Sequence, residues 1–327
     1  MHARWFLTFA AAVCLATPQA ASTAGARLNP MIALHEQGMP VFGVTHAAIA
    51  PPRQRPAPPG AAPVEPAPAL PLPSLMAAAA ETAAYRGADF TYTSYASPQA
   101  DRFMGFVGAL MRAGASVRTH PILAKVPIIH TDPPAAVARI HEQLALGHAG
   151  VMLQEVESPD EIRTALAAMR FKAQGGTRPD EGVGLAAAYW GVSDDEYRRR
   201  AQPWPLVKDG ELVLWAIVES REGIARVREI AAVPGLSVMV VGAGTLRGVF
   251  STTGAGGARV LDRQGYDAGV AAIAAACREF KVACSHPANT AAEVEALTKQ
   301  GFSVFTMQTR NDDAFAAIAA GRARAGR

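Results

Sequence analysis

The chain has 327 residues, of which 50% are hydrophobic and 18% are charged, a balance that excludes a protein disordered throughout. Its formal net charge is only +3, and the basic residues are spread along the chain rather than gathered on one arm with aromatic residues between them. We therefore expect a globular protein with no nucleic-acid partner.

Residues 1–24 have the layout of a secretory signal peptide. Arg4 precedes an apolar run from Trp5 to Ala16, which is too short to span a bilayer comfortably and is followed by small residues. A buried N-terminal helix is the alternative. We predict cleavage between Ala20 and Ala24 and an exported protein, periplasmic or secreted, with no stable membrane association after the signal is removed.

A proline-rich stretch follows at residues 51–73, which contain ten prolines. Proline supplies no backbone donor and fixes one backbone angle, so we expect an extended loop here. A linker between two domains is the alternative. However, only one short strand, at residues 41–45, precedes the stretch after the signal. We therefore interpret it as an insertion within a single domain that covers residues 25–327.

Eight short apolar or β-branched runs alternate with helical patterns. The runs are residues 41–45, 90–93, 122–126, 150–153, 213–218, 238–241, 282–284 and 304–306. Helices are expected at residues 97–112, 132–146, 158–169, 221–232, 266–280, 291–300 and 312–323, several opened by a capping residue and a proline. This alternation predicts a parallel sheet, and eight units that close on themselves form a (β/α)8 TIM barrel. A doubly wound open sheet is the alternative, but no phosphate-binding loop follows an early strand.

Two cysteines, Cys277 and Cys284, remain once the signal is removed. Export permits a disulfide between them. We expect Cys277 at the end of a helix and Cys284 in the next strand, so the pairing stays open, and two buried thiols are favoured.

Reactive side chains of such barrels lie where the strands end. Candidates at or near these positions are His46, His120, Lys125, Glu155, Glu219, Thr245, Arg247 and His286. Glu219 directly follows an apolar strand, where a carboxylate is able to bind a divalent cation. Its structural alternative is a carboxylate at the start of the helix that begins at Ser220 and Arg221.

An ordered set of short motifs runs along the chain. It includes GVML at 150–153, MRF at 169–171, AYWG at 188–191, AIVESREG at 216–223, VPG at 233–235 and VGAGTL at 241–246. Together they resemble the HpcH/HpaI aldolase family, which is related to citrate lyase. The resemblance covers about residues 30 to 320 and implies a TIM barrel of the phosphoenolpyruvate/pyruvate type.

The resemblance also implies retro-aldol cleavage of 2-oxo acids with a divalent metal ion, Mg²⁺ or Mn²⁺. Glu219 matches the family's metal-binding glutamate, but Thr245 stands where the family has its metal-binding aspartate, and a neutral hydroxyl is a weaker ligand. Lys125 is nearest to the family's substrate-binding arginine, keeping the charge without the bidentate fork. Residues 94–97 replace the family's histidine-containing stretch.

Other residues are candidates to replace the family's second metal-binding carboxylate and its proton-transferring histidine. We predict that Glu155 joins Glu219 as a metal ligand and that His46 or His120 moves the proton, with Lys125 as the third catalytic candidate. Arg247 is expected to bind the substrate. Each has a structural alternative: a histidine that is a structural donor, a solvated loop carboxylate, a surface ion pair. The substrate-binding set is Lys125, Gly242, Ala243, Thr245 and Arg247.

These residues predict a carbon–carbon lyase of the aldolase type, an aldehyde-lyase with a modified metal site. Its substrate is expected to be a small molecule, a 2-oxo or hydroxy acid or a related carbonyl compound. The family resemblance implies a homo-oligomer. The alternative is a non-catalytic barrel that binds a small anionic ligand outside the cytoplasm.

Overall fold

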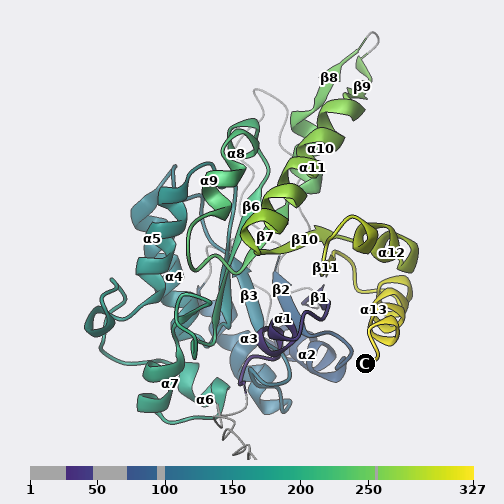
Figure 1. Cartoon of the computed structure of the whole chain (residues 1–327). Helices are drawn as coiled ribbons and strands as arrows, with labels where there is room; N and C mark the ends of the chain where they lie inside the picture. Colours follow the sequence, from purple (N-terminus) through teal and green to yellow (C-terminus); the bar gives the residue numbers. More distant parts are fainter. Residues whose placement is uncertain (1–26, 47–71, 94–99, 255–256) are drawn as a thin grey trace, which may run out of the picture.

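Eight parallel strands close into a barrel in the computed structural model of the chain, which describes residues 27–46, 72–93, 100–254 and 257–327 (Figure 1). The strands are β1 (Val41–Thr45), β2 (Phe90–Thr93), β3 (Ile122–Lys125), β4 (Gly150–Leu153), β6 (Leu212–Val218), β7 (Val238–Val241), β10 (Ala283–Pro287) and β11 (Val304–Met307). Parallel pairing of β1 with β11 and of β4 with β6 closes the ring. A short strand, β5 (Pro203–Trp204), adds to the side of β6. The predicted TIM barrel is confirmed.

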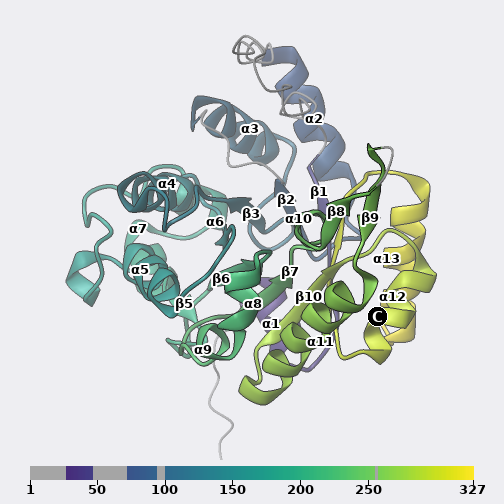
Figure 2. The same ribbon diagram turned by 90° about the horizontal axis from the view of Figure 1, so that it is seen from above.

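Helices surround the strands (Figure 2). They are α1 (Pro30–Glu36), α2 (Leu72–Ala84), α3 (Ala100–Arg112), α4 (Pro133–Ala145), α5 (Pro159–Met169), α6 (Ala186–Trp190), α7 (Asp194–Arg200), α8 (Arg221–Ala225), α9 (Val227–Ala231), α10 (Ala243–Val249), α11 (Arg263–Phe280), α12 (Ala291–Lys299) and α13 (Asp312–Arg324), with a 3-10 turn at Lys172–Gln174. Most expected helix starts agree with the structure and follow a capping residue. Asp132, for example, accepts the N–H of Ala135 at 3.0 Å, with proline in the first turn of α4. By contrast, α11 begins at Arg263, three residues before the expected start.

The barrel interior is a packed core. All seven residues of β6 are buried, as expected for a strand covered on both faces. Inside the ring, Phe90 meets Trp215 edge to face, with ring centroids 5.0 Å apart. Gly43 makes this packing possible, because a Cβ there would lie 2.0 Å from the Phe90 ring. The alternation along each strand therefore decides which side chains reach the interior.

Several elements were not expected from the sequence, namely α1, α2, α6, α7, β5 and, near the mouth, α10 with a β-hairpin. Residues 243–249 form α10, and β8 (Ser251–Thr253) pairs with β9 (Arg259–Leu261) as an antiparallel hairpin. Figure 1 shows the hairpin extending from α10 and α11, away from the barrel. The predicted single helix at 221–232 is divided at Arg226.

Parts of the expected N-terminal organisation lie outside the described residues, namely the signal at 1–24 and most of the proline-rich stretch. Residues 72 and 73 of that stretch belong to the first turn of α2, where proline is tolerated. In the described part of the chain, no helix combines the length and the apolar character needed to cross a bilayer.

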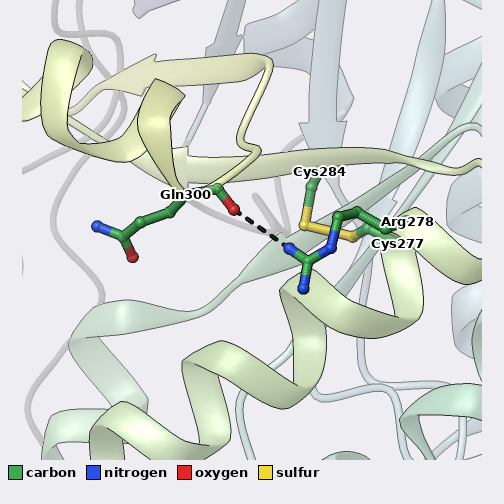
Figure 3. Close-up of a disulfide and its surroundings, with 4 residues drawn as sticks. All are labelled: Cys277, Arg278, Cys284 and Gln300. Atoms are coloured by element: carbon green, nitrogen blue, oxygen red, sulfur yellow. Dashed lines mark hydrogen bonds between the residues drawn. A yellow bond between two sulfur atoms is a disulfide. The ribbon is translucent and has the colours of Figure 1, made fainter.

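Cys277 and Cys284 form a disulfide between α11 and β10 (Figure 3). Their Cα atoms are 5.7 Å apart, within the usual range for this bond. The preference for two buried thiols is therefore wrong. Both residues are buried as expected, but the turn between them brings the sulfur atoms together.

Candidate active site

A cavity of about 310 Å³ opens at the carboxyl ends of the barrel strands. Its lining residues are Tyr92, Lys125, Met152, Ile217, Glu219, Val240, Val241, Gly242, Ala243, Gly244, Thr245, Pro287, Thr306 and Gln308. This is the end at which active sites of such barrels form, because every strand contributes its exit loop there. We call this cavity the mouth cavity.

Lys125 and Glu219 bring opposite charges to the mouth cavity. Lys125 is the last residue of β3, and Glu219 directly follows β6. Ile217 also lines the cavity, so Glu219 reaches the interior by the alternation of the strand. Glu219 is only 8% exposed, and a carboxylate so shielded interacts more strongly with a nearby charge than one in water.

The Glu219 carboxylate is held by the backbone around it. Its Oε1 accepts the backbone N–H of Glu155 at 3.2 Å. On the other side lies Gly242, where an added Cβ would be 2.3 Å from the Glu219 Cβ and 2.7 Å from Oε2. Gly242, which follows β7, is hydrogen-bonded to the neighbouring strand β6, because its N–H donates to the carbonyl of Val218 at 3.0 Å. A glycine at this position therefore lets the carboxylate lie against the backbone.

Glu155 approaches the site through its backbone rather than its side chain. It has a left-handed conformation with φ of 49°, and its backbone N–H donates to Glu219. Its carboxylate is not among the groups that line the mouth cavity as described. The structure therefore does not bring the two predicted metal ligands together as a pair of carboxylates.

His46 and His120 do not line the mouth cavity. His46 has the same parity as Phe42 and Val44 and packs outward on Phe106 of α3, with ring centroids 4.9 Å apart. Its Nδ1 lies 2.9 Å from the Thr91 hydroxyl, and burial lowers the pKa of His46 to about 3. The imidazole is thus neutral and structural in its surroundings. His46 therefore does not lie at the mouth as predicted, because side chains alternate along β1 and His46 falls on the outward side.

His120 is placed at the opposite end of the barrel. It precedes β3, so it lies at the amino ends of the strands. Its ring bonds to the carbonyl of Tyr85 at 3.3 Å and to the Thr119 hydroxyl at 3.0 Å, and burial lowers its pKa. The prediction that His120 lies at the mouth overlooked its position before Ile122, the first residue of β3, which places it at the other end of that strand.

Arg247 and His286 also point away from the mouth cavity. Arg247 extends from α10 over the ring of Tyr266, at 5.1 Å from its centroid. His286 has the parity of the buried Cys284 and faces the helix layer, where it meets Phe302. Both line a separate groove of about 530 Å³ beside α11. By contrast, Gly242, Ala243 and Thr245 line the mouth cavity, and their role in substrate binding stays a prediction.

Three polar residues of the mouth cavity were missed in the sequence. These are Tyr92, Thr306 and Gln308. The Tyr92 hydroxyl donates to the carbonyl of Met307 at 3.1 Å, and burial raises its pKa. Gln308 directly follows β11, the position from which the other candidates were taken, so this signal was present. Tyr92 could be assigned to the cavity only once it was known which side chains of β2 face the barrel interior, and the sequence alone did not reveal this.

The donor set of the mouth cavity does not fit a tightly held divalent cation. Such ions prefer six or more oxygen ligands with several carboxylates among them. Among the described residues, Glu219 is the single carboxylate that lines the cavity, and the Lys125 ammonium shares the space. Within the described ranges, no three histidine, cysteine, aspartate or glutamate side chains gather as a metal site.

The fold and the mouth cavity define a (β/α)8 barrel with a lysine and a glutamate at the carboxyl ends of its strands. The sequence pattern of the HpcH/HpaI aldolase/citrate lyase family matches residues 110–309. The chain therefore belongs to the HpcH/HpaI aldolase/citrate lyase family, as the motifs had indicated.

Individual relatives agree with this assignment. The chain is 30% identical over 115 residues to hydroxypyruvate/pyruvate aldolase from Sagittula stellata (strain ATCC 700073 / DSM 11524 / E-37). That match spans 35% of this chain and 42% of the relative's length.

Solved structures show the same fold. An HpcH/HpaI aldolase/citrate lyase family protein from Burkholderia cenocepacia J2315 superposes with a TM-score of 0.63 at 18% identity, over 90% of this chain and 97% of the other. An HpcH/HpaI aldolase from Desulfitobacterium hafniense DCB-2 gives 0.58 at 16% identity, over 90% and 94% of the two chains.

Proposed function

We propose that this chain is an exported carbon–carbon lyase of the aldolase type that cleaves a 2-oxo acid bearing a hydroxyl group two carbons from the carbonyl. The observation that carries the proposal is the presence of Lys125 and Glu219 in one cavity at the carboxyl ends of the strands. Membership of the aldolase/citrate lyase family and the match to a hydroxypyruvate/pyruvate aldolase support this reaction class. The disulfide supports export, because such bonds persist in oxidising compartments. A homo-oligomeric state is part of the same proposal.

Lys125 binds the acidic end of the substrate. Its ammonium attracts the carboxylate and the adjacent 2-oxo oxygen, and this attraction grows as negative charge develops on that oxygen. The hydroxyls of Tyr92 and Thr306 and the amide of Gln308 supply neutral hydrogen-bonding groups around the same space. The apolar side chains of Met152 and Val240 form part of the wall.

Glu219 moves the proton in this proposal. Its carboxylate accepts the proton of the substrate hydroxyl on C4, and the bond between C3 and C4 breaks. The C4 fragment leaves as an aldehyde, and the electron pair becomes an enolate whose oxygen is held by Lys125. Glu219 then returns the proton to C3, which yields the 2-oxo acid. The step balances without an oxidant or a reductant.

No step is assigned to a metal ion, because the donor set does not fit one. In the related family pattern a second carboxylate would stand at Thr245, and here a hydroxyl replaces it. The expectation of Mg²⁺ or Mn²⁺ is therefore tested by direct measurement of the metal content and by restoring the second carboxylate at Thr245.

The enolisation half-reaction tests the proposal even while the aldehyde product is unidentified. Mature protein is incubated with pyruvate or hydroxypyruvate in D2O, and exchange of the C3 hydrogens is followed by proton NMR. We expect exchange above the buffer rate and a loss of about 10² to 10⁴-fold in Glu219→Gln. Lys125→Met is expected to raise the half-saturating pyruvate concentration, and Lys299→Met, on the exposed face of α12, serves as the control.

The competing function is a barrel that binds a small anion without chemistry. It is favoured by the absence of His46 and His120 from the mouth cavity. Pyruvate that binds in a Lys125-dependent manner with no C3 exchange, and with no aldehyde release from 4-hydroxy-2-oxo acids, would establish that function and reject the lyase.

A further inference from the structure

A second cavity of about 310 Å³ lies at the opposite end of the barrel from the mouth. Its walls come from segments that precede strands, including Gly38 and Met39 before β1, Leu236 and Ser237 before β7, and residues 277–283 before and at the start of β10. We call this cavity the basal pocket. Of the residues that the structure describes, none lines both this pocket and the mouth cavity, so the proposed lyase chemistry does not use it.

One wall of the basal pocket is aromatic. The rings of His35 and Trp204 are stacked, with centroids 5.7 Å apart and planes within 11°. Apolar side chains such as Leu236 and Val282 continue this wall. A flat ring is well suited to such a surface, since aromatic groups pack in offset stacks.

His35 has an unfilled hydrogen-bonding position at this wall. Its Nε2 atom is buried and has no hydrogen-bond partner within the described part of the chain. Burial lowers the pKa of His35 to about 4, so the ring is neutral near pH 7. Buried polar atoms of native proteins are normally bonded, so a ligand atom at this position would complete the arrangement.

The other side of the basal pocket is cationic. Arg278 and Lys281 lie on the loop that the Cys277–Cys284 disulfide closes, and both line the pocket. Figure 3 shows Arg278 beside the disulfide, with its guanidinium donating to the carbonyl of Gln300 at 3.3 Å. Lys281 ends α11 in a left-handed conformation with φ of 56°.

These two cations are not neutralised within the pocket. Its lining, as described, contains no aspartate or glutamate. Glu279, on the same loop, pairs with Arg228 of α9 instead. A cationic rim next to an aromatic wall, with one buried ring nitrogen, selects for an anionic and planar ligand.

We propose that the basal pocket binds a small aromatic carboxylate. The ring lies against Trp204, the carboxylate is held by Arg278 and Lys281, and a polar substituent reaches Nε2 of His35. The disulfide fixes the positions of Arg278 and Lys281 relative to each other, so the oxidised protein binds the ligand more tightly than the reduced one. This site is separate from the proposed lyase site.

Benzoate is the probe for this site, and the full mature chain in its oxidised form is the protein. Binding is measured by calorimetry and by the change in tryptophan fluorescence, for which Trp204 is the reporter because it lines the pocket, whereas Trp190 and Trp215 are fully buried and do not line it. We expect saturable binding of benzoate and at least about tenfold weaker binding of the neutral analogue benzamide. Cyclohexanecarboxylate, which has the charge without the flat ring, is also expected to bind more weakly.

Substitutions locate the site. Arg278→Ala and Lys281→Asn are each expected to weaken benzoate binding about tenfold, whereas Lys281→Arg retains it. Asparagine tolerates the left-handed conformation, so Lys281→Asn removes the charge with little risk to the fold. Arg226→Ala, which removes an exposed arginine paired with Glu229, is the matched control and leaves binding unchanged.

Three outcomes would overturn the proposal. They are no saturable benzoate binding, an affinity equal to wild type in both Arg278→Ala and Lys281→Asn, or a signal abolished by Lys125→Met, which would place benzoate at the mouth. The redox part is tested with Cys277→Ser/Cys284→Ser, for which we expect several-fold weaker binding. An unchanged affinity in that variant would show that the disulfide plays no part in binding. Failure of pyruvate exchange leaves these readouts unaffected, so the two proposals fail independently.

Discussion

The backbone N–H of Glu155 donates a hydrogen bond to Oε1 of Glu219, with 3.2 Å between the two atoms. The exit loop of β4 thereby orients the carboxylate at the end of β6, and it does so without the Glu155 side chain. Hydrogen bonds to a carboxylate from backbone amides are charge-assisted and stronger than neutral ones. Because the contact is made by the Glu155 backbone, the support that it gives to Glu219 can be tested separately from a role of the Glu155 side chain as a metal ligand.

Glu155→Gly tests which part of Glu155 matters. Glycine adopts the left-handed conformation freely, so the backbone hydrogen bond to Glu219 is retained while the carboxylate is lost. We expect C3 exchange of pyruvate close to the wild-type rate. A loss as large as that of Glu219→Gln would show that the Glu155 carboxylate takes part in the chemistry.

Gly242→Ala tests the packing that holds Glu219. The new Cβ would lie 2.3 Å from the Glu219 Cβ, so the carboxylate must move. We expect a fall in exchange rate of about a hundredfold and a loss of about 1–3 kcal/mol in the free energy of unfolding, measured with urea. Gly248→Ala, in α10 but outside the lining of the mouth cavity, is the matched control, because the nearest atom to a Cβ there is the Arg259 guanidinium at 3.6 Å, an ordinary contact. Equal losses in both variants would refute this role of Gly242.

Thr245→Asp tests the altered metal site. The substitution places a second carboxylate among the residues that line the mouth cavity, beside Glu219. We expect the wild-type protein to be purified without a stoichiometric divalent ion, as measured by elemental analysis. Thr245→Asp is expected to bind Mn²⁺ at least about tenfold more tightly than wild type. Thr245→Asn serves as the neutral control, and a wild-type chain that binds Mn²⁺ as tightly as the aspartate variant contradicts the prediction.

Buried histidines predict a dependence of stability on pH. Burial lowers the pKa of His46 to about 3 and those of His35 and His148 to about 4, from the ordinary value of 6.5. Each is neutral when folded and takes up a proton on unfolding below pH 6.5. Stability is therefore complete above that pH and decreases as the pH falls through the window from 6.5 to about 4.

The size of the effect follows from the same linkage. At pH 5 each histidine is expected to lower the free energy of unfolding by about 2 kcal/mol relative to pH 7.5. Urea unfolding at the two pH values measures the total. Because most carboxylates titrate below pH 5, a flat profile between these values would mean that the three imidazoles are not buried as described.

The sequence by itself determined the barrel. Alternating short apolar strands and capped helices are local signals, and burial of every strand on both faces follows from them. It also predicted that Glu219 and Lys125 lie at the mouth of the barrel, because each stands where an apolar strand ends. The family followed from the same ordered motifs.

Only the tertiary structure decided which way the remaining candidates face. His46 and His286 lie at strand ends, but the side chains of a strand alternate, and a shift of one residue moves a group from the interior to the helix layer. Glu155 has a left-handed backbone conformation where it contacts Glu219. The pairing of Cys277 with Cys284 depends on the turn at Lys281, which lies between them. The turn at Lys281 is closed by local hydrogen bonds from Lys281 and Val282 to the carbonyl of Cys277. Glu155, by contrast, contacts a residue 64 positions away in the chain. Patterns of hydrophobicity record neither kind of backbone conformation.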